Sequence, residues 1–297
     1  MAISLGRNRY GKAEVRLVHV DRTTPVHRLR DLTVTGQLVG RFEATHRTGD
    51  NTGVIATDTQ KNAVYALARR HGIGAPEEFA LQVARYFVGS YEQVTGARQV
   101  VEEHGWDRIT TSTGGPHDHA FVRGTGEVRT AAVVVGPAEA VVAGLRDLVV
   151  LKSTGSEFTG FPRVEFTTLP ETDDRILATA VTARWRYRAL DVDWDAAFAG
   201  VRQVLLDRFA LTRSRSLQQT LYAMGTGVLE AHDEVAEIRL SLPNRHHYLV
   251  DLAPFGLDNP NEVWVAGDRP YGLIEAAVVR DELPPADDVW AAVTDFA

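Results

Sequence analysis

The sequence predicts an α+β protein made of two tandem units, each an antiparallel arrangement of two strands, two helices and two further strands. Three observations support this fold class. The hydrophobic period changes from that of a strand to that of a helix and back within the first 125 residues. Short segments recur in the second half of the chain in the same order. The 297 residues also allow two compact units, because single cores stop growing near roughly 250 to 300 residues.

Three short repeats relate the two halves. EVRL at residues 14–17 recurs as EVRT at 127–130, LRDL at 29–32 recurs at 145–148, and PHDHAFV at 116–122 resembles PNRHHYLV at 243–250. The offsets grow slowly, from 113 to 127 residues. Three matches in one order are hard to obtain by chance. We therefore interpret residues 1–125 and 126–297 as two homologous units joined near Gly124–Gly126.

The first unit is expected to begin with a hairpin. From Tyr10 to Val20 apolar and polar residues alternate, which is strand spacing and places one set on each face: Lys12, Glu14 and Arg16 against Ala13, Val15 and Leu17. A turn at residues 22–25 leads to a second alternating segment over residues 32–38. Two such segments joined by a short polar turn predict an antiparallel pair.

Two helices follow, and two strands then close the unit. Residues 57–71 carry apolar side chains at helical spacing and end at Gly72, and a second helix is expected from Pro76. Asp58 is a candidate N-cap for the first helix. Residues 99–109 and 119–123 again have strand character.

The second unit is expected to repeat this order. PETDDRIL, residues 170–177, is interpreted as a helix start with Arg175 in its first turn, and SLQQTLYAM, residues 216–224, as a second helix. Helix N-termini attract anions, and an arginine adds planar, bidentate recognition. These starts are candidate anion-binding positions, although ordinary capping explains each of them alone.

Composition excludes several classes of function. The net charge of −7 argues against a nucleic-acid partner, and the absence of cysteine excludes disulfides, thiolate metal sites and cysteine nucleophiles. No apolar stretch approaches the roughly 20 residues that cross a bilayer. The N-terminus lacks a signal-peptide core, and the C-terminal TDFA is not a peroxisomal address. We expect a soluble, cytoplasmic protein without membrane contact.

Several polar positions have both a functional and an ordinary interpretation. Phe158 and Phe161 lie in a polar loop, where they could stack a flat ligand or fold back onto the core. Lys12 is a solvated charge unless its surroundings favour the neutral amine that a base requires. His117–Asp118–His119 supplies only two imidazoles on one strand, with no spaced third ligand, so no metal site is predicted.

PNRHHYLV places hydrogen-bonding side chains at the end of an apolar strand. Strict alternation would carry Asn244 and His246 onto the apolar side of the sheet, where unpaired polar groups are costly. Pro243 cannot donate to a sheet ladder, so an interruption or bulge is expected there. The open sheet edges at both ends of such a chain favour an oligomer that closes into a barrel.

Seven segments together resemble the urate oxidase (uricase) family over essentially the whole chain: YGKAEVRL, ATDTQKN, HDHAF, LKSTGSEFTGF, TDDRILAT, SLQQTLYAM and SLPNRHH. The resemblance implies the tunnelling fold (T-fold), with two ββααββ units per chain and a homotetramer around a central tunnel. It also implies oxidation of urate by O2 and water to 5-hydroxyisourate and hydrogen peroxide. Neither a metal nor an organic cofactor is implied.

The same resemblance assigns roles to individual residues. Lys12, Thr57 and His246 would form a catalytic proton relay. The substrate-binding residues would be Thr57, Asp58, Phe158, Arg175, Leu217, Gln218 and Asn244. Within this set Arg175 and Gln218 would grip urate, Phe158 would stack on it, and Asn244 would lie at the O2 or water position. Asp58 and Leu217 would act through their backbones. Thr57 and Asp58 would come from a neighbouring subunit, which places each active site at an interface.

Two other functions remain compatible with this sequence. Pterin-handling enzymes share the fold and bind flat heterocycles, but they often use a metal. A purine-binding protein without enzymatic activity is the third possibility.

Overall fold

The computed structural model describes residues 3–267 and 269–293, and the chain divides into two units. The first unit comprises residues 1–144, 189–195 and 284–297, and the second comprises residues 145–188 and 196–283. The expected junction near Gly124–Gly126 lies inside a strand, Gly115–Val135, so the division falls later in the chain than the sequence indicated. Residues 294–297, which carry the C-terminal TDFA, lie outside the described part.

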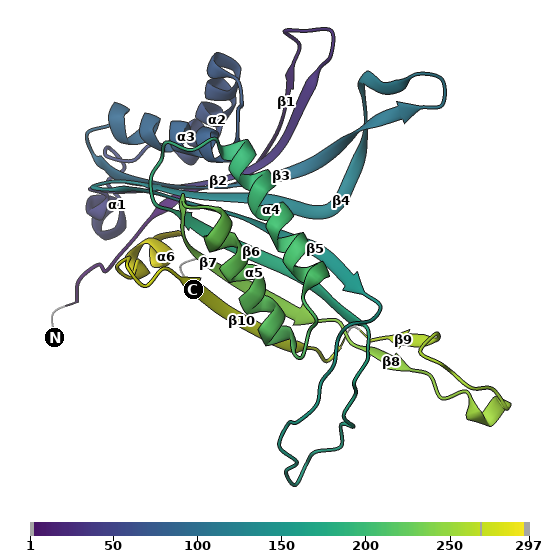
Figure 1. The fold of residues 1–297 in the computed structure, drawn as a ribbon. Helices are drawn as coiled ribbons and strands as arrows, with labels where there is room; N and C mark the ends of the chain where they lie inside the picture. Colours follow the sequence, from purple (N-terminus) through teal and green to yellow (C-terminus); the bar gives the residue numbers. More distant parts are fainter. Residues whose placement is uncertain (1–2, 268, 294–297) are drawn as a thin grey trace. The chain divides into compact units, whose positions relative to one another are not determined.

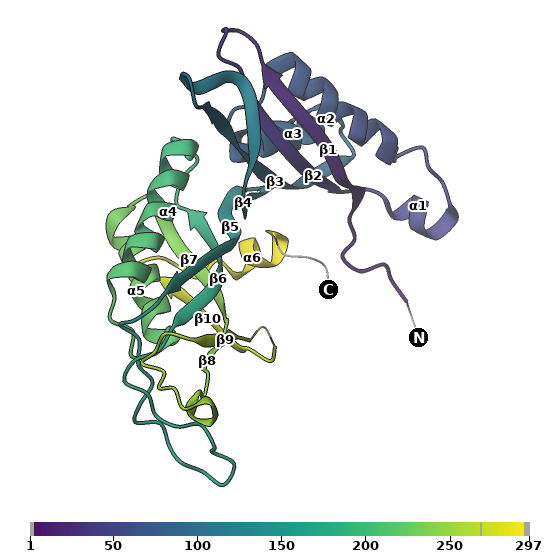
Figure 2. The same cartoon turned by 90° about the vertical axis from the view of Figure 1, so that its right-hand side faces the viewer.

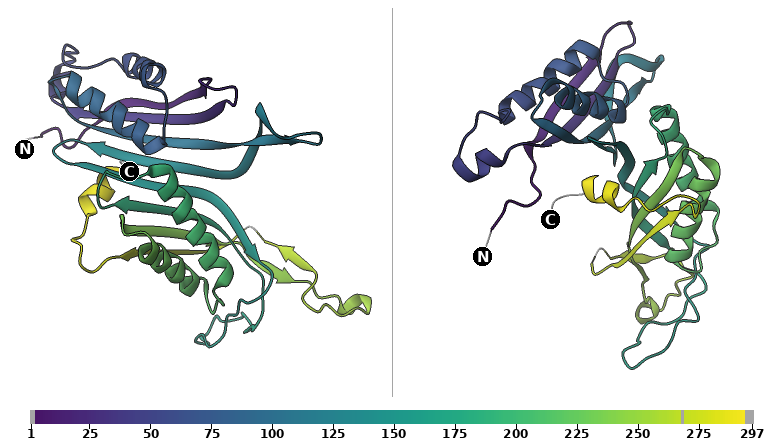
Figure 3. Two further views of the ribbon diagram at one scale, coloured as in Figure 1. Left: turned by 45° about the horizontal axis from the view of Figure 1, so that its top comes forward. Right: turned by 90° about the vertical axis from the view of Figure 1, so that its left-hand side faces the viewer.

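The first unit contains an antiparallel sheet in the order β1-β2-β3-β4, with two long helices on one face (Figures 1 and 3). Its strands are β1 (Tyr10–Asp21), β2 (Arg28–Gly40), β3 (Val94–Thr111) and β4 (Gly115–Val135). Its helices are α1 (Glu43–Thr48), α2 (Thr57–His71), α3 (Pro76–Ser90) and α6 (Asp287–Val293). The predicted hairpin and the starts of the helices at Thr57 and Pro76 are confirmed.

The second unit repeats this arrangement, with sheet order β5-β6-β7-β10 and with α5 packed on β7 and β10 (Figure 2). Its strands are β5 (Glu139–Lys152, which begins in the first unit), β6 (Leu177–Tyr187), β7 (Val235–Asn244) and β10 (Gly272–Val279). Its helices are α4 (Trp194–Leu211, whose first two residues belong to the first unit) and α5 (Leu217–Ala231). Short elements β8 (His247–Leu249), η1 (Ala253–Phe255) and β9 (Trp264–Ala266) precede β10.

The order of elements confirms an α+β fold with ββααββ repeated twice, but the short sequence repeats do not mark equivalent strands. EVRL lies in β1, the first strand of its unit, whereas EVRT lies in β4, the last strand. LRDL lies in β2 and then in β5, which are the second and the first strands of their units. The residue-by-residue matches between the halves were therefore wrong. The change of hydrophobic period predicted the order of strands and helices correctly.

Helices α2 and α3 follow from local sequence. Val64, Leu67 and Ala68 form the buried stripe of α2. The helix ends at Gly72, whose φ of +76° is costly for a residue with a side chain. α3 begins with Pro76 at its first position, where the missing N–H removes no intrahelical bond. None of the described helices is long and apolar enough to cross a membrane.

A buried ionic network fastens the elements of the first unit to one another. Arg129 on β4 binds Glu77 of α3 at 2.7 Å and Asp195 at 2.5 Å. Arg30 on β2 binds Asp195 at 2.7 Å and Glu103 of β3 at 2.6 Å. Glu77 is 0% exposed and Arg129 is 8% exposed. Because both charges are removed from water, each depends on its partner. The loss of either would leave the other charge buried without a counter-charge.

We predict that Glu77→Ala lowers the free energy of unfolding by about 3–5 kcal/mol, because it leaves the Arg129 cation buried without its fully buried partner. Urea denaturation followed by circular dichroism measures this change. The control is Glu139→Ala, which removes the exposed pair between Glu139 and Arg85 and should cost less than about 1 kcal/mol. Equal losses in the two variants would show that the buried network does not stabilise the unit.

Candidate active site

A β-bulge in β1 determines where Lys12 points. Lys12 pairs with Gly36 of β2 and Val15 pairs with Val34, so β1 contains one extra residue between these pairs. Glu14 lies in this bulge with a positive φ of 56°, and its N–H donates to Thr35 Oγ1 at 3.0 Å. The bulge shifts the alternation by one residue. Lys12 therefore shares the helix-covered face with Val15, and its predicted position on one face with Arg16 was wrong.

The same face brings Lys12 to the start of α2. The hydroxyl of Tyr10, two residues before Lys12, donates to Ile55 O at 3.2 Å and accepts from Ile55 N at 2.8 Å. These bonds hold the segment that leads into Thr57 and Asp58 against β1. The Lys12 ammonium is close enough to Asp58 to contribute to the lowered pKa of that carboxyl group, after the larger effects of Lys61 and Asn62.

Asp58 does not cap α2 through its side chain, contrary to the prediction. The helix begins at Thr57 with Ala56 as the N-cap, and no side chain makes the capping hydrogen bond. The Asp58 carboxylate instead accepts from Lys61 Nζ at 2.5 Å and Asn62 Nδ2 at 3.0 Å, one turn further along. The helix dipole and these donors keep the carboxylate ionised.

In the second unit, Ser156 joins three separate segments through backbone hydrogen bonds. Arg175 N donates to Ser156 O at 2.9 Å, and Ser156 forms a parallel bridge with Ser214. On either side of this bridge, Glu157 N donates to Ser214 O at 2.8 Å and Ser214 N donates to Gly155 O at 2.9 Å. The loop after β5, the approach to β6 and the approach to α5 are thereby held together.

Arg175 lies in an extended segment, so the predicted helix over residues 170–177 was wrong. Thr172 and Phe158 exchange two backbone hydrogen bonds, at 2.7 and 3.1 Å, and Asp174 Oδ1 accepts from Thr154 Oγ1 at 2.8 Å. These contacts to the preceding loop take the backbone groups that helical bonds would have used. The local sequence pattern that predicted a helix contains no information about these competing hydrogen bonds to another segment.

Arg175 lies beside an aromatic ring and forms no ion pair with any residue that the structure describes. Its guanidinium carbon lies 5.2 Å from the centre of the Phe158 ring, and Phe158 stacks on Phe161 at 4.9 Å. Burial lowers the pKa of Arg175, although the group stays charged near neutral pH. Its Nε is buried and has no hydrogen-bond partner among the described residues. A buried donor of this kind is costly unless a ligand or a water molecule accepts its hydrogen bond.

The start of α5 is fixed next to this cation. Ser216 caps the helix by accepting from Gln219 N at 3.2 Å, and Gln219 Oε1 accepts from Arg215 N, the residue before the cap, at 2.8 Å. Leu217, the first helical residue, is 2% exposed, whereas Gln218 is exposed. The first-turn N–H groups have no intrahelical acceptor. The predicted helix is confirmed, with Gln218 directed toward solvent.

Asn244 and His246 lie at the end of β7. Asn244 is the last residue of the strand, and Arg245 N then donates to Ala178 O of β6 at 2.8 Å. His246 is half-buried. Burial lowers its pKa most, and the neighbouring Arg175 and His247 lower it further. His246 and Arg175 are therefore electrostatic neighbours in this unit.

The strand interruption expected at Pro243 falls two residues later. β7 continues through Pro243, which lies opposite Leu273 of β10, and ends after Asn244. Residues 245 and 246 are irregular before β8 begins. Proline is accommodated within the strand. The strand ends after Asn244, so Arg245 and His246 lie outside regular secondary structure.

His117 and His119 lie in β4, where their rings are 4.6 Å apart, and His119 is 5.7 Å from His27. Arg108 of β3 donates to His117 O at 3.1 Å and Asp118 O at 2.8 Å, and His27 N of the β1–β2 loop donates to Asp118 O at 2.9 Å, so the backbone of this motif joins two hairpins. Within residues 3–267 and 269–293, no group of three or more histidine or carboxylate side chains is arranged to hold a metal.

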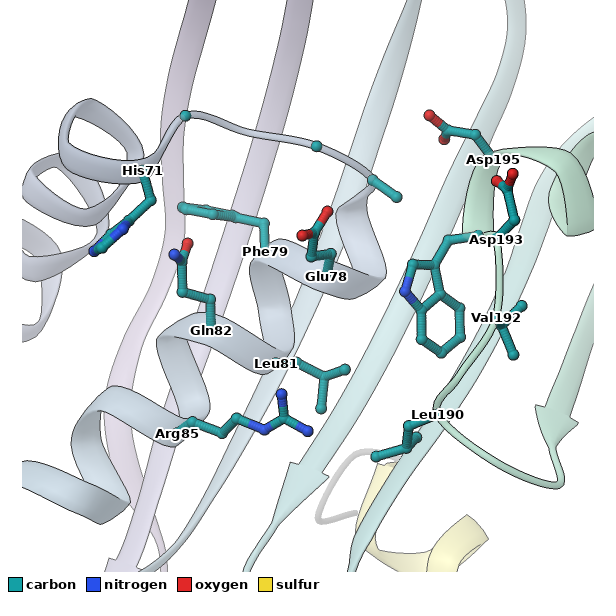
Figure 4. Close-up of a pocket in the computed structure, with 14 residues that line it drawn as sticks. His71, Glu78, Phe79, Leu81, Gln82, Arg85, Leu190, Val192, Asp193 and Asp195 are labelled. Carbon is teal, nitrogen blue, oxygen red and sulfur yellow. The ribbon is translucent and has the colours of Figure 1, made fainter.

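A cavity of about 770 Å³ lies in the first unit between α3 and the segment of residues 189–195 (Figure 4). Glu78, Arg85, Asp193 and Asp195 give its wall both signs of charge. The predicted site residues are not among those that line it. The predicted residues instead form two groups, one in each unit: Lys12, Thr57 and Asp58 in the first, and Phe158, Arg175, Leu217, Gln218, Asn244 and His246 in the second.

We predict that His246 titrates below its ordinary value of 6.5, because burial and Arg175 disfavour the imidazolium ion. An NMR titration of the ring measures this pKa. Arg175→Gln should raise it, while Arg208→Gln, which alters an exposed pair on α4, should not. Since the folded-state pKa is depressed, the stabilising contribution is complete above about pH 6.5 and is lost as pH falls through the folded pKa. An unchanged pKa in Arg175→Gln would contradict this coupling.

Comparison with known proteins identifies the family. The family model described as Uricase matches residues 8–134 and 141–275. The uricase of Arthrobacter globiformis is 55% identical over 295 residues, covering 99% of this chain and 96% of that protein. The uricase of Dictyostelium discoideum is 38% identical over 277 residues, covering 92% of this chain and 96% of that protein.

Solved structures agree in fold. The crystal structure of the Arthrobacter globiformis uricase superposes with a TM-score of 0.94 at 55% identity, covering 98% of this chain and all (100%) of the other. The urate oxidase of Bacillus sp. TB-90 superposes with a TM-score of 0.80 at 22% identity, covering 92% of this chain and 100% of the other, which shows the shared fold. The sequence match over nearly the whole length and the two ββααββ units lead to one conclusion: this chain belongs to the uricase family.

Proposed function

We propose that this protein oxidises urate with O2 and water to 5-hydroxyisourate and hydrogen peroxide, and that it needs neither a metal nor an organic cofactor. Family membership supports urate as the substrate. The single structural observation that best supports the proposal is the half-buried Arg175 cation, with its unpartnered Nε beside the Phe158 ring. A flat, anionic heterocycle complements both groups, because it can stack on an aromatic ring and accept hydrogen bonds from a guanidinium.

The binding roles proposed here are those that the family resemblance implies. Arg175 would donate to a urate carbonyl oxygen and ring nitrogen, and the Gln218 amide would both donate and accept at the other edge. Phe158 would stack on the purine plane. The backbone N–H groups at Leu217 and Asp58 lie at helix starts, where free donors and the positive end of the dipole favour an anion.

The chemical step begins with removal of a proton from bound urate. Lys12 would act through the Thr57 hydroxyl, and His246, whose lowered pKa favours the neutral imidazole, would accept and return protons at the other end of the relay. The urate dianion then gives two electrons to O2, which leaves with two protons as hydrogen peroxide. Water adds its oxygen to the purine carbon, giving 5-hydroxyisourate. Asn244 would hold first O2 and then this water.

The active site would be shared between subunits of a homotetramer. Lys12, Thr57 and Asp58 belong to the first unit, whereas Arg175 and its neighbours belong to the second. We propose that the first group of one subunit completes the second group of its neighbour. β1 and β10 are edge strands in their sheets, and pairing of such edges between subunits would close a barrel around a tunnel. The cytoplasmic location expected from the sequence stays a prediction.

The proposal predicts that purified protein consumes urate and O2 together, at equal molar rates, and that a chelator such as EDTA does not slow the reaction. Loss of the ultraviolet absorbance of urate and an oxygen electrode measure the two rates. Inhibition by the chelator would favour a metal-dependent enzyme of the same fold. Binding of urate without oxygen uptake would favour a purine-binding protein, and either result would contradict the proposed reaction.

Lys12→Met should impair turnover, whereas Arg175→Ala should impair urate binding. Loss of the base should lower kcat by about 10²- to 10⁴-fold while anaerobic urate binding stays near normal. Loss of the guanidinium should weaken anaerobic urate binding by about 10- to 100-fold. Steady-state kinetics and anaerobic calorimetry separate the two effects. Equal losses in binding and turnover for both variants would contradict these roles.

Mixing the two variants tests the shared site. If Lys12 serves the neighbouring subunit, random co-assembly of Lys12→Met and Arg175→Ala chains restores both groups in about a quarter of the sites. The control is each variant denatured and refolded alone, which should stay inactive. No recovery in a tetramer shown to contain both chains would place Lys12 and Arg175 of one chain in the same site.

A further inference from the structure

Thr179 carries a buried hydroxyl for which the fold of the second unit offers no partner. The residue is 0% exposed, and its Oγ1 has no hydrogen bond to any described residue. Its neighbours along β6, including Ala178, Ala180 and Val181, are buried and apolar. Valine has nearly the same shape and would avoid the cost of an unsatisfied hydroxyl. Packing alone therefore does not account for threonine at this position.

The register of the sheet places this hydroxyl next to Asn244. β6 and β7 are neighbouring antiparallel strands (Figure 1). Their register places Thr179 directly opposite Asn244. Residues in such a pair point to the same face, with Cβ atoms about 4.5–5.5 Å apart. The hydrogen bond from Arg245 N to Ala178 O, 2.8 Å long, fixes this register at the end of the strand.

The other flank of Asn244 is open. On that side β10 places Gly272 opposite Asn244, and glycine has no side chain to offer a hydrogen bond. Of the two residues that lie opposite Asn244 in the adjacent strands, Thr179 is therefore the one with a side chain that can bind the Asn244 amide. Asn244 itself makes no side-chain hydrogen bond with the described residues, and an amide without partners can rotate between orientations.

We propose that Thr179 is a positioning residue: its hydroxyl binds the Asn244 amide, directly or through one ordered water, and fixes the orientation in which Asn244 holds O2 and water. The inference rests on the proposed function, because it assigns Asn244 to the oxygen site. Hydrogen bonds in an active site are often long in the ligand-free protein and shorten when the substrate binds. Thr179 would thereby act on the oxygen step and leave urate binding unchanged.

The test compares Thr179→Val, Thr179→Ser and Thr182→Val. Thr182 is a half-buried threonine of the same strand that lies opposite Ser241. Thr179→Val should lower kcat/KM for O2, at saturating urate, by about tenfold, while the anaerobic Kd for urate stays within about twofold. Thr179→Ser should recover most of the loss, and Thr182→Val should match the wild type. Thermal unfolding should show that Thr179→Val is folded and no less stable.

A double-mutant cycle completes the test, because a residue that acts through Asn244 has nothing to position once Asn244 is replaced. Thr179→Val should have no further effect in an Asn244→Ala background. Wild-type kinetics in Thr179→Val, parallel loss of urate binding, or additive effects in the double variant would overturn the inference. If Thr179→Val does not fold, failure of the folded Thr179→Ser variant to retain O2 kinetics would also overturn it. A wild type that consumes no O2 with urate would instead refute the proposed function.

Discussion

The backbone junction at Ser156 is the constraint on which the candidate site depends. Ser156 and Ser214 are both 0% exposed, so their peptide groups are paired within the protein, and they pair with each other's segments and with Arg175. This pairing places Phe158, Arg175 and the start of α5 together without regular secondary structure. Backbone hydrogen bonds of 2.8–2.9 Å thereby tie the loop after β5 to the segments that precede β6 and α5.

Charge is used in opposite ways in the two units. In the first, Arg129 and Arg30 are each matched by two acidic groups at 2.5–2.7 Å, which fastens strands and helices and leaves neither guanidinium available to a ligand. In the second, Arg175 is half-buried beside Phe158 and has no carboxylate partner among the described residues. Arginine therefore stabilises the first unit through ion pairs, whereas in the second unit Arg175 is the cation that we propose binds the substrate anion.

The sequence predicted more of the fold than of the local geometry. Period changes located the first hairpin and α2, α3 and α5, because these elements bury a stripe or a face that repeats along the chain. The helix expected around Arg175 failed, because Thr172 and Asp174 bond to a loop that lies far away in sequence. The short repeats failed for another reason: four residues are too few to mark equivalence, and EVRL and EVRT occupy non-equivalent strands.

The sequence by itself determined the class of fold, the family resemblance and the residue types available for chemistry, because these depend on composition and spacing along one chain. The tertiary structure decided how those residues are presented. The bulge at Glu14 turns Lys12 toward α2, and the Ser156 junction sets Arg175 beside Phe158. The pairing of Thr179 with Asn244 depends likewise on the register of β6 and β7. In each case the deciding contact joins residues distant in sequence, so no local pattern could encode it.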